Sequence, residues 1–70
     1  MNIKSLTYLS LRSNQITQIQ PGSFDSLVNL WGLDLENNKL TKLDKKSLFK
    51  NCLKLKKVET EGNPCHHDSL

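Results

Sequence analysis

Apolar residues recur at two different spacings around an asparagine in the segment LTYLSLRSNQITQIQ, which spans residues 6–20. A helix needs apolar residues at i, i+3, i+4 and i+7, and a half-buried strand needs strict alternation, so neither rule describes the whole segment. The same arrangement returns 24 residues later in LWGLDLENNKLTKLD, and a weaker copy begins at Leu55 in LKKVETEGNPC. The pattern is therefore a repeat. Its matched positions are Leu6, Leu9, Leu11, Asn14, Ile16 and Ile19 in the first copy and Leu30, Leu33, Leu35, Asn38, Leu40 and Leu43 in the second.

Each copy predicts one coil that consists of a short strand and a returning half. The alternation of apolar and polar positions predicts strands at about residues 8–11, 32–35 and 57–60. Successive coils bring these strands side by side in a three-stranded parallel sheet, because every coil returns the chain to the same side. We expect irregular or short helical turns in the returning segments PGSFDSL and KKSLFKNCL, with Phe24 and Phe49 stacked beneath them.

An asparagine follows each predicted strand, at Asn14, Asn38 and Asn63. The chain must turn there, which leaves inward-pointing backbone N–H and C=O groups without partners in the sheet. Each buried group left unpaired costs about 1–3 kcal/mol. A side-chain amide supplies two donors and one acceptor, so it can satisfy the turn and the neighbouring coil together. We therefore expect a ladder of three inward amides.

The spacing LxxLxLxxNxLxxLxxxxFxxL resembles that of the leucine-rich repeat family over nearly the whole chain. The 24-residue length, with Phe in the returning half, resembles the typical subclass of extracellular receptors and matrix proteoglycans. The segment EGNPC, residues 61–65, resembles the start of a cysteine-rich C-terminal cap, but HHDSL follows where such caps continue with an aromatic residue and Cys-x-Cys. The tail therefore resembles a truncated cap.

This resemblance implies an α/β solenoid, a right-handed coil whose concave sheet binds a protein partner. It also implies an extracellular protein or receptor ectodomain, with the cytoplasm as the alternative. Residues 1–70 would form one domain, with repeats at about 6–29, 30–54 and, in part, 55–70. No apolar run approaches the roughly 18 residues needed to cross a bilayer. The repeat pattern already includes Ile3, so we expect a fragment, a truncated gene product or a piece of a longer array. Its open ends favour self-association.

The charges are distributed unevenly around a formal net charge of +3, with eight of the ten basic residues from Lys39 onward. Outward strand positions instead gather carboxylates, because the rows Ser10–Asp34–Glu59 and Arg12–Glu36–Glu61 align across the sheet. Aligned like charges cost stability, so this face predicts a protein partner with a basic surface. The alternative is a solvated face whose repulsion Arg12 and Lys57 relieve. The predicted partner-binding residues are Tyr8, Ser10, Arg12, Trp31, Asp34, Glu36, Lys57, Glu59 and Glu61, and Trp31 either anchors a partner or folds over the coil edge.

The lysines define an alternative function on the convex side. A basic surface can bind a glycan or a nucleic acid by releasing counterions. No aromatic residues interleave with these lysines as a single-strand binder requires, so nucleic acid and glycan are the less favoured partners and solubility is the simpler explanation. The residues concerned are Lys45, Lys46, Lys50 and Lys54 in the returning half and Lys39 and Lys42 in the preceding turn.

The remaining chemistry does not predict an enzyme. Cys52 and Cys65 stand where other copies have Leu or Ile, which fits two buried thiols or one disulfide bridge. Cys65 precedes His66, His67 and Asp68, but no second ligand pair has zinc spacing, so we expect no metal. There is neither a nucleophile with a base nor a phosphate-cradling glycine loop, so we also expect no catalysis and no cofactor.

Overall fold

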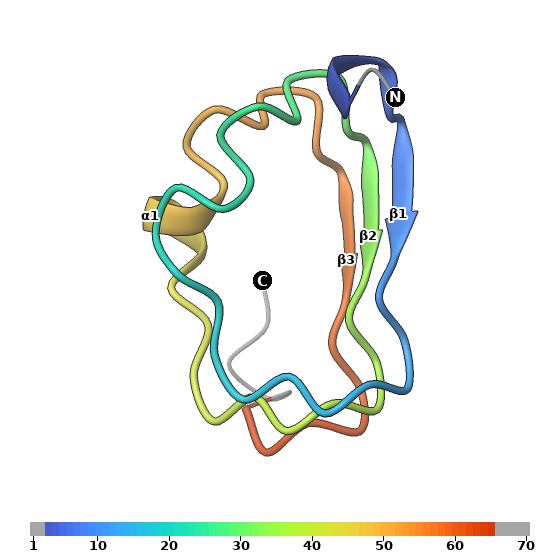
Figure 1. Ribbon diagram of the computed structural model, residues 1–70, viewed down its shortest axis with the longest axis vertical. Helices are drawn as coiled ribbons and strands as arrows, with labels where there is room; N and C mark the ends of the chain where they lie inside the picture. Colours follow the sequence, from blue (N-terminus) through green and yellow to red (C-terminus); the bar gives the residue numbers. More distant parts are fainter. Residues whose placement is uncertain (1–2, 66–70) are drawn as a thin grey trace.

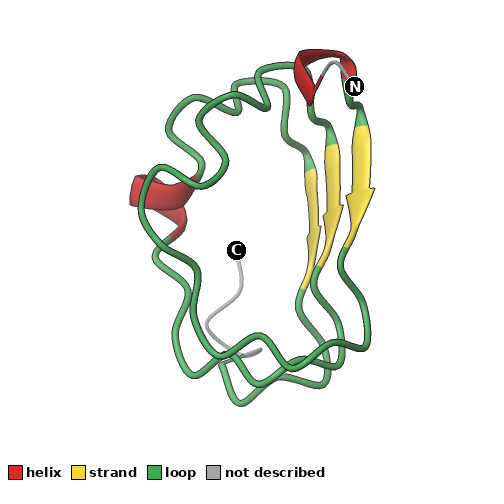
Figure 2. Ribbon diagram, viewed as in Figure 1, coloured by secondary structure: helices red, strands yellow, loops and turns green. Residues whose placement is uncertain are grey.

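The computed structural model describes residues 3–65. The chain passes through three successive coils that contribute one strand each, with the strands on one side and α1 on the opposite side (Figure 1). Loops form most of each coil (Figure 2). The elements are η1 (Ile3–Ser5), β1 (Tyr8–Ser10), β2 (Gly32–Asp34), α1 (Lys45–Leu48) and β3 (Lys57–Glu59). No helix in this part of the chain is long and apolar enough to cross a membrane.

The strands form a parallel sheet in the order β1-β2-β3, as predicted. Tyr8 lies opposite Gly32, which lies opposite Lys57, and the next positions follow in the same register. Each strand ends one residue earlier than predicted. The Leu11 N–H still donates to the Asp34 carbonyl at 2.8 Å, but the Leu11 carbonyl accepts hydrogen bonds from asparagine side chains. The sheet therefore ends where side-chain amides replace strand partners.

The turn after each strand has the same backbone conformation. The residue before each repeated asparagine is left-handed, with φ of 60° at Ser13, 59° at Asn37 and 81° at Gly62. Few residues with a Cβ adopt this region readily, and at Gly62 a Cβ would also collide with Oδ1 of Asn37. The recurrence of this conformation shows that one turn is used in all three coils.

Two of the three repeated asparagines join neighbouring coils, as predicted. Nδ2 of Asn38 donates to the Leu35 carbonyl of its own coil at 2.9 Å and to the Leu11 carbonyl of the preceding coil at 3.0 Å. Its Oδ1 accepts from the N–H of Ile16 at 3.1 Å. Asn63 repeats this arrangement with the Thr60 and Leu35 carbonyls and the Leu40 N–H. Both side chains are buried, so each amide satisfies backbone groups that water does not reach.

The prediction that Asn14 belongs to this buried ladder is wrong. Asn14 is exposed, and its Nδ2 donates only within its own coil, to the carbonyls of Leu11 at 2.8 Å and Arg12 at 3.2 Å. Because β1 is an edge strand, no preceding coil lies against it among residues 3–65. Asn14 therefore supports the local turn alone.

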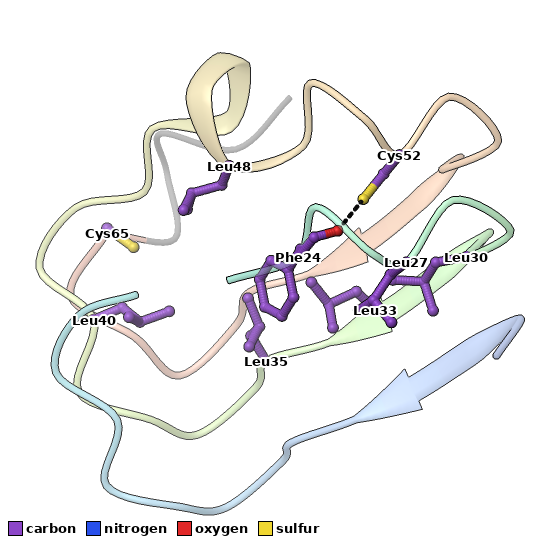
Figure 3. Packing of buried hydrophobic residues seen from close by; sticks show 9 residues of the cluster. All are labelled: Phe24, Leu27, Leu30, Leu33, Leu35, Leu40, Leu48, Cys52 and Cys65. Atoms are coloured by element: carbon purple, nitrogen blue, oxygen red, sulfur yellow. Dashed lines mark hydrogen bonds between the residues drawn. The ribbon is translucent and has the colours of Figure 1, made fainter. Parts of the chain in front are cut away.

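The leucines of the middle coil lie at the centre of the core, together with buried residues of the returning halves (Figure 3). Leu30, Leu33, Leu35 and Leu40 are 0% exposed, whereas their first-coil equivalents Leu6, Leu9, Leu11 and Ile16 are only partly buried. In the returning halves, Phe24 and Phe49 stack as predicted, with ring centroids 5.8 Å apart. The predicted short helical turn is α1, where the Asp44 side chain caps the N-terminus by accepting from the N–H of Ser47 at 3.3 Å.

Both cysteines are free and buried, which agrees with the interpretation as two packed thiols. The Cys52 Sγ donates to the Phe24 carbonyl at 3.5 Å (Figure 3). Burial, and then the charge of Asp25, raises the pKa of the Cys52 thiol, so the protonated form is favoured. His66, His67 and Asp68, which we considered as metal ligands together with Cys65, lie outside the described residues.

The asparagine contacts predict unequal effects of two identical substitutions. Asn38→Ala should lower the free energy of unfolding by about 3 kcal/mol, because it leaves buried carbonyl and N–H groups of two coils unpaired. Asn14→Ala should cost less than about 1 kcal/mol, because water replaces its hydrogen bonds. Urea denaturation followed by circular dichroism measures both values. Equal losses in the two variants would contradict a coil-bridging role for Asn38.

Candidate functional site

The predicted partner-binding residues come together on the side of the sheet that faces away from the core. The strand register places Gly32 between Tyr8 and Lys57, and Asp34 between Ser10 and Glu59. The next row follows the strand ends, where the Glu36 carbonyl accepts from the N–H of Ser13 and the Glu61 carbonyl accepts from the N–H of Asn37. We call this surface the outward sheet face. Its residues are Tyr8, Ser10, Arg12, Trp31, Gly32, Asp34, Glu36, Lys57, Glu59 and Glu61.

Tyr8 crosses the outward sheet face from β1 to β3. Its ring lies over Gly32, where a Cβ would come within 2.7 Å of the Tyr8 Cδ1. Its hydroxyl donates a long hydrogen bond of 3.4 Å to Oε1 of Glu59. Gly32 is therefore a residue that shapes the outward sheet face and that the predicted set of partner-binding residues did not include. The available signal was its place between Tyr8 and Lys57 in one row, where a glycine leaves room for a neighbouring ring.

Trp31 packs beside Tyr8 at the start of β2. The two ring centroids are 5.7 Å apart, and the rings are tilted by 42°. The Trp31 N–H donates to the Thr7 carbonyl at 2.8 Å, and its own carbonyl accepts from the N–H of Lys56 at 2.9 Å, so both neighbouring coils hold its backbone. The residue is 46% exposed, which supports the alternative of an exposed aromatic at the rim.

The carboxylates of this face differ in accessibility. Glu61 is exposed, and Glu36 and Glu59 are half-buried. Asp34 is only 5% exposed, so the prediction that it presents a surface to a partner is wrong. Asp34 lies on the central strand between two neighbours, and its Oδ1 folds back to accept from the N–H of Glu36 at 3.0 Å. The negative charge of Asp34 still acts on neighbouring groups of the face, because it contributes to the raised pKa values of Tyr8 and Glu36. Its side chain, however, offers almost no surface to a partner.

Basic residues only partly relieve this negative charge. Arg12 lies 3.5 Å from Glu36, and Lys57 lies 4.0 Å from Glu59, and both basic side chains are more than half exposed. Desolvation, and then the charge of Asp34, raises the pKa of Glu36, although Arg12 opposes that shift. The pKa of Tyr8 is raised by desolvation, then by the charges of Glu59 and Asp34. The outward sheet face is therefore an aromatic and acidic surface suited to attract cations.

The lysines of the returning half lie away from this face. Lys46 and Lys50 are exposed on and after α1, on the side of the coils opposite the sheet (Figure 1). Lys54 donates to Oδ1 of Asn29 at 3.0 Å. A groove of about 410 Å³ lies between the first two returning halves, and its lining is both polar and apolar, with residues such as Gln18, Ile19, Lys42, Asp44 and Leu48. Among residues 3–65, no group of His, Cys, Asp and Glu side chains is placed to hold a metal ion.

The environment of Tyr8 predicts an alkaline titration, which is measurable because it is the single tyrosine. Absorbance at 295 nm should give the folded chain a midpoint above 10.0, because desolvation and nearby carboxylates disfavour the phenolate. The folded state then binds the proton more tightly than the unfolded state. The stability that follows is present below the unfolded pKa and is lost as pH rises through the folded pKa.

Glu59→Gln should bring the Tyr8 midpoint back toward 10.0 without abolishing the whole shift, because desolvation is the largest cause. The chain in concentrated urea supplies the unfolded reference. A folded midpoint equal to the urea value would show that Tyr8 does not lie against these carboxylates.

A family model described as leucine rich repeat matches residues 4–63. No match to an individually curated protein was found. Leucine-rich repeat domains generally mediate protein–protein interaction and are typically non-catalytic. The match covers the three strands and both returning halves, and it agrees with the repeated turn, the buried asparagines and the parallel sheet. The chain has a solenoid-like repeat fold and belongs to the leucine-rich repeat family.

Proposed function

We propose that this protein is a recognition module that binds a basic protein partner on the outward sheet face. The observation that carries the proposal is that Glu36, Glu59 and Glu61 share this face with two half-exposed aromatic rings, of which that of Tyr8 contacts Glu59 through its hydroxyl. Aligned like charges destabilise a sheet, and an oppositely charged partner relieves that repulsion. The interaction role that is general in the family supports the same reading.

The proposal also covers the handedness of the coil, the subclass of the family and the cellular setting of the protein. We propose that the coil is right-handed, because connections between parallel strands of one sheet are almost always right-handed. The 24-residue period and the resemblance of the segment EGNPC to the start of a cysteine-rich cap support membership of the typical extracellular subclass. An extracellular protein or receptor ectodomain is therefore the proposed setting, in which the sheet is concave and faces the ligand.

Self-association through the coil ends is part of the same proposal. The β1 edge and the partly buried side chains of Leu6, Leu9 and Leu11 support it, because apolar coil faces and strand edges are surfaces that other chains can cover. Sedimentation equilibrium of the full chain tests this point directly. A single monomeric species across the accessible concentration range would exclude it.

The alternative function is polyanion binding through the lysines of the returning half. The exposed Lys46 and Lys50 favour it. Such binding should weaken steeply with salt, because each neutralised phosphate or sulfate releases counterions. Binding to heparin that survives Glu36→Gln/Glu59→Gln and is lost in Lys46→Gln/Lys50→Gln would support this alternative.

A peptide selection tests the main proposal. Random peptides displayed on phage and selected against the full chain should be enriched in Arg and Lys. Glu36→Gln/Glu59→Gln should weaken the selected clones by about tenfold, equivalent to about 1.4 kcal/mol, because it removes two carboxylates from the binding face.

The matched control is Gln18→Lys/Gln20→Lys, which changes the net charge by the same amount at exposed positions away from the sheet. It should alter affinity by less than about twofold, since only distant, screened charge changes. Clones that respond equally to both variants would point to net charge rather than to the outward sheet face, and would refute the proposal.

A further inference from the structure

We infer that the outward sheet face contains a subsite for one arginine side chain of the partner, in the corner formed by the Tyr8 ring, the Trp31 ring and the Glu59 carboxylate. This inference rests on the proposed function and names the chemical group that the face recognises. The corner draws on all three coils, because Tyr8 lies on β1, Trp31 directly precedes β2 and Glu59 lies on β3.

The fold positions this corner before a ligand arrives. The absence of a side chain at Gly32 lets the Tyr8 ring lie across the central strand, and a long hydrogen bond of 3.4 Å from its hydroxyl to Oε1 of Glu59 places its far end beside β3. Backbone hydrogen bonds to both neighbouring coils hold the main chain of Trp31, and its ring packs beside the Tyr8 ring with the centroids 5.7 Å apart. Side chains that are already ordered lose less conformational freedom on binding, so a modest contact yields more affinity.

The chemistry of the corner suits a guanidinium group. Tyr8 and Trp31 are 41% and 46% exposed, so parts of both rings are accessible. Aromatic faces attract cations, and a planar guanidinium can stack on a ring while its N–H groups donate to a carboxylate. A lysine ammonium is a compact point charge that cannot make both kinds of contact with the same geometry. Arginine should therefore bind more tightly than lysine.

Lys57, which lies near Glu59, competes only weakly with an arginine ligand for this carboxylate. Nζ of Lys57 lies 4.0 Å from Oε1 of Glu59, at the limit of an ion pair, and its side chain is 57% exposed. Exposed ion pairs of this kind contribute little. An incoming guanidinium can therefore share or replace the contact of Lys57 with Glu59 at small cost.

The single tryptophan reports on this subsite directly. The probe is the peptide acetyl-Gly-Gly-Arg-Gly-Gly-amide, titrated into the full chain while Trp31 emission and its indole N–H resonance are followed. We expect a saturable change with a dissociation constant of about 1–10 mM, as befits one stacked, hydrogen-bonded side chain. The citrulline peptide, which is neutral and nearly isosteric, should bind at least about tenfold more weakly. The lysine peptide should lie between them.

Three variants separate the subsite from a general acidic surface. Gly32→Ala adds a Cβ where the Tyr8 ring lies; the ring can swing away, so the fold should persist while arginine affinity falls by about fivefold or more. Tyr8→Leu should have the same effect. Leu53→Ala removes an apolar side chain that is 88% exposed and away from the sheet, and it should change nothing. Circular dichroism checks that each variant is folded.

The outcomes distinguish this inference from the proposed function. Equal affinity for the arginine and citrulline peptides, or an unchanged affinity in a folded Gly32→Ala chain, would overturn the arginine subsite. If displayed clones still depended on Glu36 and Glu59 in that case, the proposed function would stand without it. If no clone depended on those residues, the proposed function would fail as well.

Discussion

The outward sheet face depends on a buried side-chain amide. Asn38 hydrogen-bonds to its own coil and to the preceding one, and Asn63 does the same one coil later. These amides set how far each strand lies along its neighbour, because they tie the turn after one strand to the turn after the next. The left-handed residue before each asparagine makes that inward placement feasible. Strand register, and with it the alignment of the carboxylates, follows from this contact.

A second constraint is that one coil cannot bury its own leucines. The middle coil has four leucines with no exposed surface, and the first coil, with a neighbour on one side only, leaves the equivalent positions partly exposed. Stability in such an array comes from the interfaces between coils as much as from the coils themselves. The same stacking creates the candidate site, since Tyr8, Trp31 and Glu59 belong to three different coils. Loss of one interface between coils would therefore lower the stability and also separate the residues of the proposed arginine subsite.

The repeat pattern correctly predicted the features that recur in every coil, such as the strands. It did not predict features that depend on which side chains lie on adjacent strands. Periodicity placed the strands to within one residue, paired Phe24 with Phe49 and identified Asn38 and Asn63 as buried. Asn14 was misplaced because its repeat position is the same while its environment, at the end of the sheet, is not. The burial of Asp34 and the path of Tyr8 over Gly32 depend on side chains from adjacent strands, which a pattern along one chain does not encode.

Charge is distributed so that carboxylates repel one another on the sheet. This repulsion lowers the stability of the free chain and at the same time favours the binding of a cation. Carboxylates gather on the sheet and lysines on the returning side, so a chain with a formal net charge of +3 presents an acidic face. The raised pKa of Glu36 reflects desolvation and the repulsion within that face. An acidic surface whose carboxylates repel one another gains more from binding a cation than an uncharged surface does. Binding relieves the repulsion in addition to forming new contacts. Under the proposed function, a small loss of stability in the free chain becomes selectivity for a basic partner, and the proposed subsite of Tyr8, Trp31 and Glu59 favours arginine over lysine.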